Sequence, residues 1–199
     1  MSFLSIFNLI SIMQHTKTDL AEQIFMATDR LMAKEGLTQL SMHKLAKEAN
    51  VAAGTIYLYF KNKDELLEQF ARRGFAIFMA TLEKDFDESK PFFEQYRQMW
   101  WNIWQFLQEN PTILSNLNQY QSLPNFFEIC RGVKNDRWEF FCRQARKADI
   151  LTDLPDDILF LLSLKTSIVI ATDMKFINVS LNNEILESVI ERSWRAIQK

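Results

Sequence analysis

Apolar residues recur at the spacing of helix faces along most of the 199-residue chain, whereas the strict alternation that indicates strands is rare. The first helical pattern begins at Thr18, which we predict to be its N-cap. It ends at Gly36, because glycine accepts the left-handed backbone of a helix C-cap. The chain contains only four Gly and four Pro, and long periodic runs with few breakers predict an all-α protein.

Two short helical patterns separated by a tight turn lie between Ser41 and Lys63. Ser41 is expected to cap the first of them. Asn50 stands in the turn, and asparagine tolerates the positive φ that such a turn needs. We expect the second helix over about residues 52–60, and the pair is typical of a helix-turn-helix unit.

The second helix of this unit has a small, uncharged outer face. With Ile56 and Phe60 placed inward, a rotation of about 100° per residue leaves Gly54, Thr55 and Leu58 on the opposite side. A helix that enters a DNA major groove needs a small residue where its backbone approaches, and a hydroxyl and a methyl for base edges. The stretch therefore favours DNA recognition.

A capping box formed by Asn62 and Glu65 predicts the start of a fourth helix, which leads into the rest of the chain without a Gly, Ser or Pro linker. The helices expected from there on cover residues 63–86, 91–109, 110–121, 124–148 (bent at Gly132), 155–176 and 183–197. The predicted organisation is a three-helix DNA-binding domain over residues 16–62 and a larger helical domain over residues 63–199.

The expected helix over residues 155–176 is apolar nearly all round in its first half. Such a helix must be covered on more than one side. A partner subunit can supply that cover, through a four-helix interface that also uses the final helix; the alternative is burial wholly within the monomer. The residues predicted for this interface are Leu161, Leu164, Ile168, Val189 and Trp194.

The net charge of −2 provides no global basic field for nucleic acid, but the charge is uneven along the chain. Between Ser41 and Lys63 there are four Lys and one Glu, with His43 in addition. This local positive patch is compatible with a surface that binds phosphates. The alternative is an ordinary solvated helix surface.

Two further features concern the setting of the protein. Cys130 and Cys142 make neither a CxxC nor a zinc-binding spacing, which fits a reduced, cytoplasmic protein. Residues 1–15 are apolar but lack the basic start of a signal peptide and are too short to span a bilayer. We expect an extra N-terminal helix packed on the body, or a true start at Met13; a membrane anchor is the minor alternative.

Over about residues 18–70 the chain resembles the TetR family of transcriptional regulators. The most specific part of the resemblance is the run GTIYLYFKNKDELL, which begins at Gly54. The other matching positions, in the first two helices and the turn, are Ile24, Ala27, Leu31, Gly36, Ser41, Leu45, Ala46, Ala49 and Val51.

The resemblance implies an all-α homodimer that binds double-stranded DNA at palindromic operators, and most members are repressors released by a small ligand. It implies a recognition helix with Thr55, Tyr57 and Tyr59 at the DNA, and Lys63 on a phosphate. Ser41 and His43, at the head of the preceding helix, match positions that also approach DNA.

The C-terminal part of the chain is rich in aromatic residues, which suggests a pocket for a lipophilic or aromatic effector. The residues predicted to line it are Trp100, Trp104, Phe127, Trp138 and Phe141. The alternative is the plain packing of a helical core, which the spacing of Trp100 and Trp104 supports equally well.

Three classes of function follow from these features. The first is a ligand-responsive repressor; the alternative is an all-helical ligand-binding or interaction protein that has lost specific DNA binding. Ala52 motivates the alternative, because many family members have a capping Ser or Thr there. An enzyme is poorly supported: no catalytic motif, metal-ligand cluster or cofactor-binding loop is present, so we predict no catalytic residues, metal or cofactor.

Overall fold

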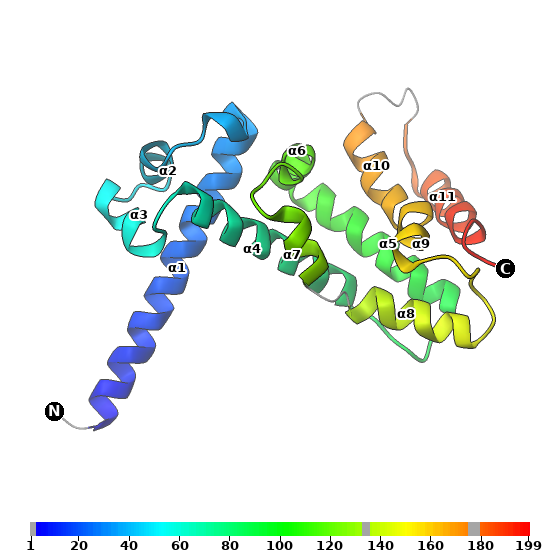
Figure 1. The fold of residues 1–199 in the computed structure, drawn as a ribbon. Coiled ribbons are helices and arrows are strands. Elements are labelled where there is room, and N and C mark those ends of the chain that lie inside the picture. Colours follow the sequence, from blue (N-terminus) through cyan, green and yellow to red (C-terminus); the bar gives the residue numbers. More distant parts are fainter. Residues whose placement is uncertain (1–2, 133–135, 175–179) are drawn as a thin grey trace. The chain divides into compact units, whose positions relative to one another are not determined.

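The computed structural model describes the backbone of residues 3–132, 136–174 and 180–199, and the side chains of residues 19–130, 137–174 and 180–199 (Figure 1). Within these ranges the chain is helical apart from its loops and one isolated antiparallel bridge between Leu151 and Gln198. The prediction of an all-α fold is confirmed. No helix of the described part has both the length and the apolar character needed to cross a membrane.

The helices form two compact units, one of residues 1–71 with 118–126 and one of residues 72–117 with 127–199. Their bounds, in chain order, are α1 (Phe3–Glu35), the 3₁₀ turn η1 (Leu37–Gln39), α2 (Met42–Glu48), α3 (Ala53–Tyr59), α4 (Lys63–Glu83), α5 (Phe92–Glu109), α6 (Pro111–Tyr120), α7 (Phe126–Gly132), α8 (Asp136–Lys147), α9 (Asp156–Leu162), α10 (Lys165–Asp173) and α11 (Asn183–Arg195). Helices α4, α6 and α7 each contribute residues to both units. The boundary between residues 62 and 63 stays a prediction.

Helix α1 supports the rest of the first unit. Its backbone begins at Phe3, so Thr18 lies inside the helix and the predicted N-cap there is wrong. It ends as predicted before Gly36, which has φ 85°, in the region that favours glycine. The side chains of residues 3–18 lie outside the described part, and with them the predicted packing of an N-terminal helix on the body.

The C-terminal end of α1 is held by the last turn of α6. The side-chain oxygen of Gln119 accepts a hydrogen bond from the Leu37 backbone N–H at 2.7 Å, and its amide nitrogen donates to the Met32 carbonyl at 3.2 Å. Tyr120 donates its hydroxyl to the buried Asp29 carboxylate at 2.8 Å. These bonds satisfy polar groups at and near a helix end and fix the helix on which α2 and α3 rest.

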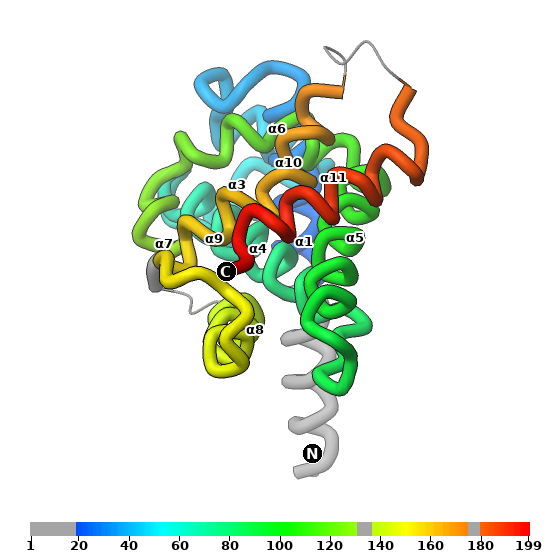
Figure 2. The backbone as a smooth tube through the Cα atoms, turned by 90° about the vertical axis from the view of Figure 1, so that its right-hand side faces the viewer, coloured from blue at the N-terminus to red at the C-terminus, as the bar shows by residue number. Residues whose placement is uncertain are grey.

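The second unit has its own core, centred on α5, which packs against α10 and α11 (Figures 1 and 2). The larger side chains of this core that are fully or almost fully buried include Leu82, Tyr96, Met99, Trp100, Ile103, Leu107, Trp138, Phe141, Leu159, Leu164, Ile190 and Trp194. At the edge of the core Arg97 on α5 forms an ion pair with Glu187 on α11, and its hydrogen bond holds the pKa of the Glu187 carboxyl below its usual value.

The structure corrects the long helix expected over residues 155–176. The chain breaks at Ser163, which has φ −126° and ψ −91°, so two helices, α9 and α10, replace it. After the break, the backbone N–H groups of Thr166 and Ser167 donate hydrogen bonds to the carbonyls three residues earlier, those of Ser163 and Leu164. The predicted end at residue 176 lies outside the described residues. A break that rotates α10 relative to α9 changes which apolar side chains face the core.

The segment expected as one bent helix over residues 124–148 is described as α7 and α8. Helix α7 ends at Gly132, where the bend was predicted, and residues 133–135 lie outside the described part. The hydrogen-bonded turn before α7 contains Asn125, which has φ 55°.

Candidate nucleic-acid interface

The helix-turn-helix begins with α2, which Ser41 caps as predicted. The Ser41 hydroxyl accepts a hydrogen bond from the Lys44 backbone N–H at 3.3 Å. Met42, Leu45 and Ala46 form the buried face of α2, which packs against α1. Only the polar side of this short helix remains for solvent.

The turn between the two helices has a defined backbone. Asn50 has φ 55°, which confirms the predicted left-handed conformation. The Val51 backbone N–H donates a hydrogen bond to the Ala46 carbonyl at 2.9 Å. The side-chain amide of Gln23 on α1 donates to the Ala49 carbonyl at 2.6 Å. The turn is therefore tied both to α2 and to α1.

Helix α3 is anchored on its inner side by Ile56 and Phe60, both of which are buried as predicted. The Phe60 ring packs against Phe25 of α1, with 5.5 Å between ring centroids. Ala52 occupies the N-cap position without a side-chain hydrogen bond, also as predicted. Two large side chains four residues apart, slightly more than one helical turn, fix the rotation of the helix about its axis.

The outer side of α3 carries no charge. Leu58 is 81% exposed and Tyr57 is 55% exposed. Gly54 is exposed as well, and a Cβ added there would meet no atom within 4 Å. Thr55 and Tyr59 are half-buried on the flanks. The face that would meet another molecule is thus small and uncharged at its first turn and apolar or phenolic further along.

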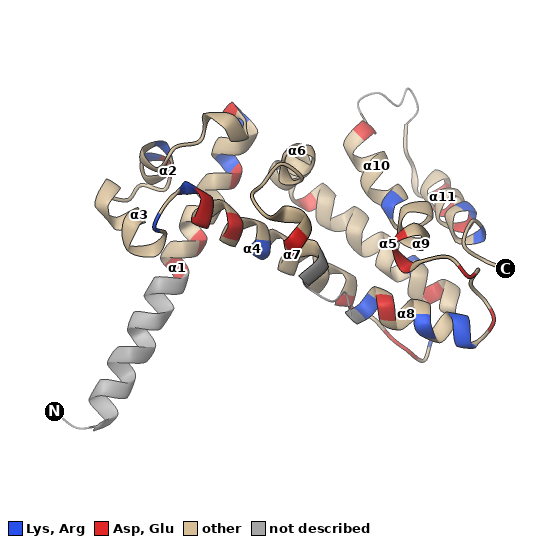
Figure 3. Cartoon of the chain, viewed as in Figure 1, with Lys and Arg blue, Asp and Glu red and all other residues tan. Residues whose placement is uncertain are grey.

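Positive charge lies on either side of this face rather than on it (Figure 3). Lys47 and His43 on α2 are exposed, and Lys61 and Lys63 stand just after α3, exposed and half-buried respectively. Lys44 is engaged by Glu35, at 2.7 Å, and this hydrogen bond holds the pKa of the Glu35 carboxyl below its usual value. The cations available for phosphates therefore flank the reading helix.

The junction between α3 and α4 is held by a variant of the predicted capping box. Asn62 accepts a hydrogen bond from the Glu65 backbone N–H at 2.9 Å. Glu65 reaches back to the backbone N–H of Lys61 at 2.6 Å, one residue before the position a capping box usually uses. These two bonds hold the segment that carries Lys61 and Lys63.

Each residue predicted to meet DNA thus has a defined place in the first unit. Ser41 and His43 stand at the start of α2, and Lys63 is the first residue of α4. Thr55, Tyr57 and Tyr59 belong to α3. Their contacts with DNA stay a prediction. The structure adds Leu58, which the sequence pattern placed on the outer face without assigning it to the site.

The aromatic residues predicted to line an effector pocket are mostly packed in the core. Trp100 and Trp104 stack with 5.8 Å between centroids, and Trp138 and Phe141 stack at 5.4 Å. All four are buried, whereas Phe127 is 62% exposed on α7. The structure therefore places four of the five in the core, the arrangement of the plain-packing alternative.

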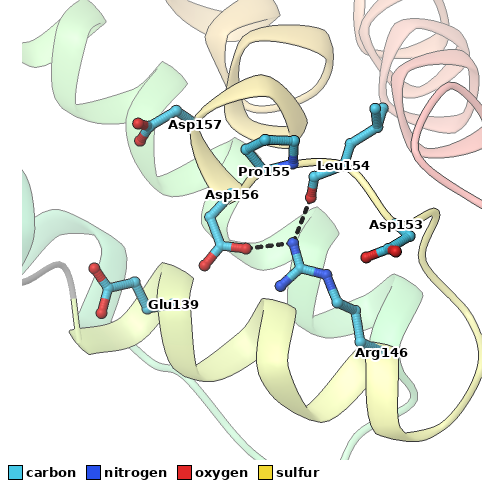
Figure 4. A pocket seen from close by; sticks show the side chains of 7 residues that line it. All are labelled: Glu139, Arg146, Asp153, Leu154, Pro155, Asp156 and Asp157. Atoms are coloured by element: carbon cyan, nitrogen blue, oxygen red, sulfur yellow. Dashed lines mark hydrogen bonds and ion pairs between the residues drawn. The ribbon is translucent and has the colours of Figure 1, made fainter.

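A hollow of about 590 Å³ lies elsewhere in the second unit, between α8 and the start of α9 (Figure 4). It is lined by Glu139, Arg146, Asp153, Leu154, Pro155, Asp156 and Asp157, none of which was predicted as an effector residue. Arg146 donates to the Leu154 carbonyl at 2.6 Å and pairs with Asp156. Among the described residues, no three His, Cys, Asp or Glu side chains gather closely enough to hold a metal ion.

The predicted dimer residues divide into two groups. Leu164 and Trp194 are buried in the core of the single chain. Their place in a dimer interface stays a prediction. Ile168 and Val189 are half-buried, and Leu161 is 55% exposed.

Leu161 is one of several exposed apolar side chains on and after α9, a set that we term the α9–α10 apolar face. Its large apolar side chains, all of them exposed, are Ile158, Leu161, Leu162, Val169 and Met174. Helix α9 and the residues that follow it therefore expose several large apolar side chains.

The bonds that Gln119 and Tyr120 make to α1 could not be foreseen from sequence. Both residues lie more than 80 positions from their partners, and neither carries a local motif. The exposure of Leu58 could be foreseen, because its spacing from Ile56 and Phe60 already placed it outward.

Two family models match this chain. The model for bacterial regulatory proteins of the tetR family matches residues 24–70. The model for the tetracyclin repressor-like C-terminal domain matches residues 91–198, more than half of the chain. The chain belongs to the TetR family of transcriptional regulators. In this TetR-family regulator, α2 and α3 are the helix-turn-helix of the DNA-binding domain, as predicted.

Individual relatives agree with this assignment. The regulator is 78% identical over 187 residues to an HTH-type transcriptional regulator of Haemophilus influenzae, a match that covers 94% of this chain and 100% of the relative. A crystal structure of a TetR-family transcriptional regulator from Haemophilus influenzae Rd has a TM-score of 0.89, with 78% identity, 92% of this chain and 99% of that chain covered. A TetR-family structure from Vibrio parahaemolyticus has a TM-score of 0.79 at 30% identity. The match covers 90% of this chain and 99% of that chain.

One further relative matches the TetR-family regulator only locally. The fatty acid metabolism regulator protein of Bacillus subtilis is 41% identical over 66 residues, which cover 33% of this chain and 34% of that protein. The similar proteins are transcriptional regulators, a role that is not enzymatic.

Proposed function

We propose that this regulator is a repressor that binds a palindromic operator as a homodimer and is released by a small lipophilic or aromatic effector. The observation that carries the proposal is the outer face of α3. This face is anchored from behind by Ile56 and Phe60, is free of charge, and is flanked by lysines. Such a surface suits base edges in a major groove, with phosphates on both sides.

In this proposal each part of the interface has its own role. Thr55, Tyr57 and Tyr59 contact the operator from α3, while Ser41 and His43 approach it from the start of α2. The ammonium group of Lys63 neutralises a phosphate, which makes the affinity fall as salt rises. The hydrogen bond that the Lys61 backbone N–H donates to the Glu65 carboxylate holds this segment in place in the free protein.

The experiment that tests DNA binding is a mobility shift with the full-length chain and the DNA that flanks its own gene, at several salt concentrations. We expect a specific band that weakens as salt rises, because the proposed contacts to phosphate release counterions. A folded protein that gives no specific band even at low salt would contradict the proposal. Such a result would favour the alternative, a helical ligand-binding or interaction protein that does not read DNA.

A homodimer is proposed from the α9–α10 apolar face. A two-fold dimer that reads half-sites one turn apart would need its two copies of α3 about 34–36 Å apart. The palindrome of the operator follows from that symmetry. Leu161 is the predicted interface residue with the largest exposed fraction, so it offers the most surface to a second copy.

Replacing Leu161 by Asp should therefore weaken the dimer at least tenfold, because a carboxylate would be buried against apolar groups. Sedimentation velocity over a dilution series measures the effect. The matched control is Phe127→Asp, which changes a similarly exposed apolar residue that lies on α7 instead. A dimer that survives Leu161→Asp, or that breaks only with Phe127→Asp, would refute this interface.

The effector part of the proposal rests on the match to the tetracyclin repressor-like C-terminal domain. An effector that binds one conformation better than another shifts the population away from the DNA-bound form. A thermal-shift screen of lipophilic and aromatic compounds, followed by mobility shifts with each stabilising compound, tests it. Compounds that stabilise the protein without releasing DNA would contradict the effector role.

A further inference from the structure

We propose that Leu58 determines operator specificity by contacting the 5-methyl group of a thymine in the major groove. The inference deepens the proposed function and rests on it: it names the chemistry that α3 can recognise. Three observations carry it, namely the exposure of Leu58, the side chains that α3 lacks, and the open space at Gly54.

The first observation is that Leu58 is held in solvent by the packing of its neighbours. At 81% it has the largest exposed fraction of any large apolar side chain in the described residues. Ile56 and Phe60, two positions before and after it, are buried and fix the rotation of α3. Leu58 therefore cannot turn into the core, and its apolar surface stays available to a partner.

The second observation concerns the chemistry that α3 does not contain. From Ala53 to Tyr59 the helix has no Arg, Lys, Asn, Gln, Asp or Glu. Bidentate recognition of guanine uses Arg or Lys, that of adenine uses Asn or Gln, and cytosine is read by Asp or Glu. Only hydroxyls and apolar groups remain on α3. Thymine is the base that presents an apolar group, its 5-methyl, in the major groove.

The third observation is the space around Gly54, one helical turn before Leu58. The two residues lie on the same side of α3, and no atom lies within 4 Å of the position that a Gly54 Cβ would take. The backbone of the first turn can approach the DNA closely there, which brings the projecting Leu58 side chain towards the base edges. The lysines that flank α3 favour DNA over an apolar protein partner for this face.

The test uses an operator selected from random DNA by the full-length protein. Each thymine in one half-site is replaced in turn by deoxyuridine, which differs from thymidine only by the missing methyl group. Fluorescence anisotropy at fixed salt then measures the dissociation constant. We expect one position per half-site at which affinity falls about fourfold, the factor that corresponds to one buried methyl-sized group.

The Leu58→Ala variant should bind the thymine operator more weakly and should lose the sensitivity to deoxyuridine at that one position. Leu58→Met, which keeps an apolar side chain of similar reach, should retain it. Replacing the sensitive T·A pair by 5-methylcytosine·G should be tolerated better than replacing it by C·G, because 5-methylcytosine carries a methyl at the same place. Both variants should keep the thermal stability of the wild type, since Leu58 contributes little buried surface.

Two results would overturn the inference while leaving DNA binding intact. One is a wild-type protein whose affinity is unchanged by every deoxyuridine substitution. The other is a Leu58→Ala variant that remains as sensitive to the missing methyl as the wild type. If the selection enriches no DNA at all from a folded protein, the proposed function falls and the role of Leu58 falls with it.

Discussion

Replacing Gly54 by Asp should lower the affinity for the operator at least 100-fold, while the protein stays folded. Gly54 lies on the outer face of α3, where a new side chain meets no atom within 4 Å, so the fold can accept it. An Asp in the first turn of a helix also interacts favourably with the helix dipole. On bound DNA, however, the carboxylate would face a polyanion, and such like-charge contacts cost several kcal/mol.

Two control variants separate charge from shape in this experiment. Gly54→Ala adds a methyl without charge; it should stabilise α3 by about 0.5–1 kcal/mol and affect operator affinity far less than Asp does. Asn183→Asp adds the same charge in the first turn of α11, on an exposed residue of the other unit, and should leave DNA binding unchanged. Anisotropy titrations and thermal melts of all three variants provide the comparison. Strong operator binding by a folded Gly54→Asp protein would show that α3 does not face DNA.

Replacing Trp100 by Ala should cost about 3–5 kcal/mol of unfolding free energy, the largest effect on stability that we predict. Trp100 is fully buried in the core of the second unit and stacks on Trp104. Its indole N–H donates to the Thr166 hydroxyl at 2.8 Å, and Thr166 in turn donates to the Ser163 carbonyl at 2.7 Å. The substitution therefore leaves a cavity and also removes a donor at the break between α9 and α10.

Guanidinium denaturation followed by circular dichroism measures this loss, and Trp100→Phe is the matched control. Phenylalanine fills most of the space but cannot donate to Thr166, so we expect a loss of about 1–2 kcal/mol. The difference between the two variants separates the cavity from the hydrogen bond. A loss below about 1 kcal/mol for Trp100→Ala would mean that the site relaxes into the space, or that the aromatic cluster encloses room for an effector.

Features that depend on a few neighbouring residues were predictable from the sequence. The cap at Ser41, the positive φ of Asn50, the end of α1 at Gly36 and the inward side of α3 all follow from local backbone preferences and helical spacing. The DNA-binding head is built almost wholly from such features. The residues that resemble the TetR family in this part of the chain are therefore largely the same residues that determine its backbone geometry.

The helical character of the second unit was predictable, but its division into helices was not, because the helices expected over residues 124–148 and 155–176 are each described as two. Periodicity alone suggested one apolar helix over residues 155–176, and it could not show that Ser163 leaves the helical conformation. Apolar residues on both sides of that break serve different purposes: Leu164 lies in the core, whereas Leu161 and Val169 face solvent. A sequence pattern marks a residue as apolar but does not state which surface covers it.

The all-α fold and the helix-turn-helix of residues 41–63 with its uncharged outer face could be read from the sequence alone, because they arise from contacts within a few turns. The folded chain was needed to show which aromatic residues pack together, that Gln119 and Tyr120 hold α1, and which apolar residues stay exposed. These outcomes depend on residues tens of positions apart meeting in space, and no local preference encodes such meetings. The outer face of α3 depends on local pattern and on tertiary packing together. The residue spacing predicted that Leu58 points outward, and the packing of Ile56 and Phe60 holds it there.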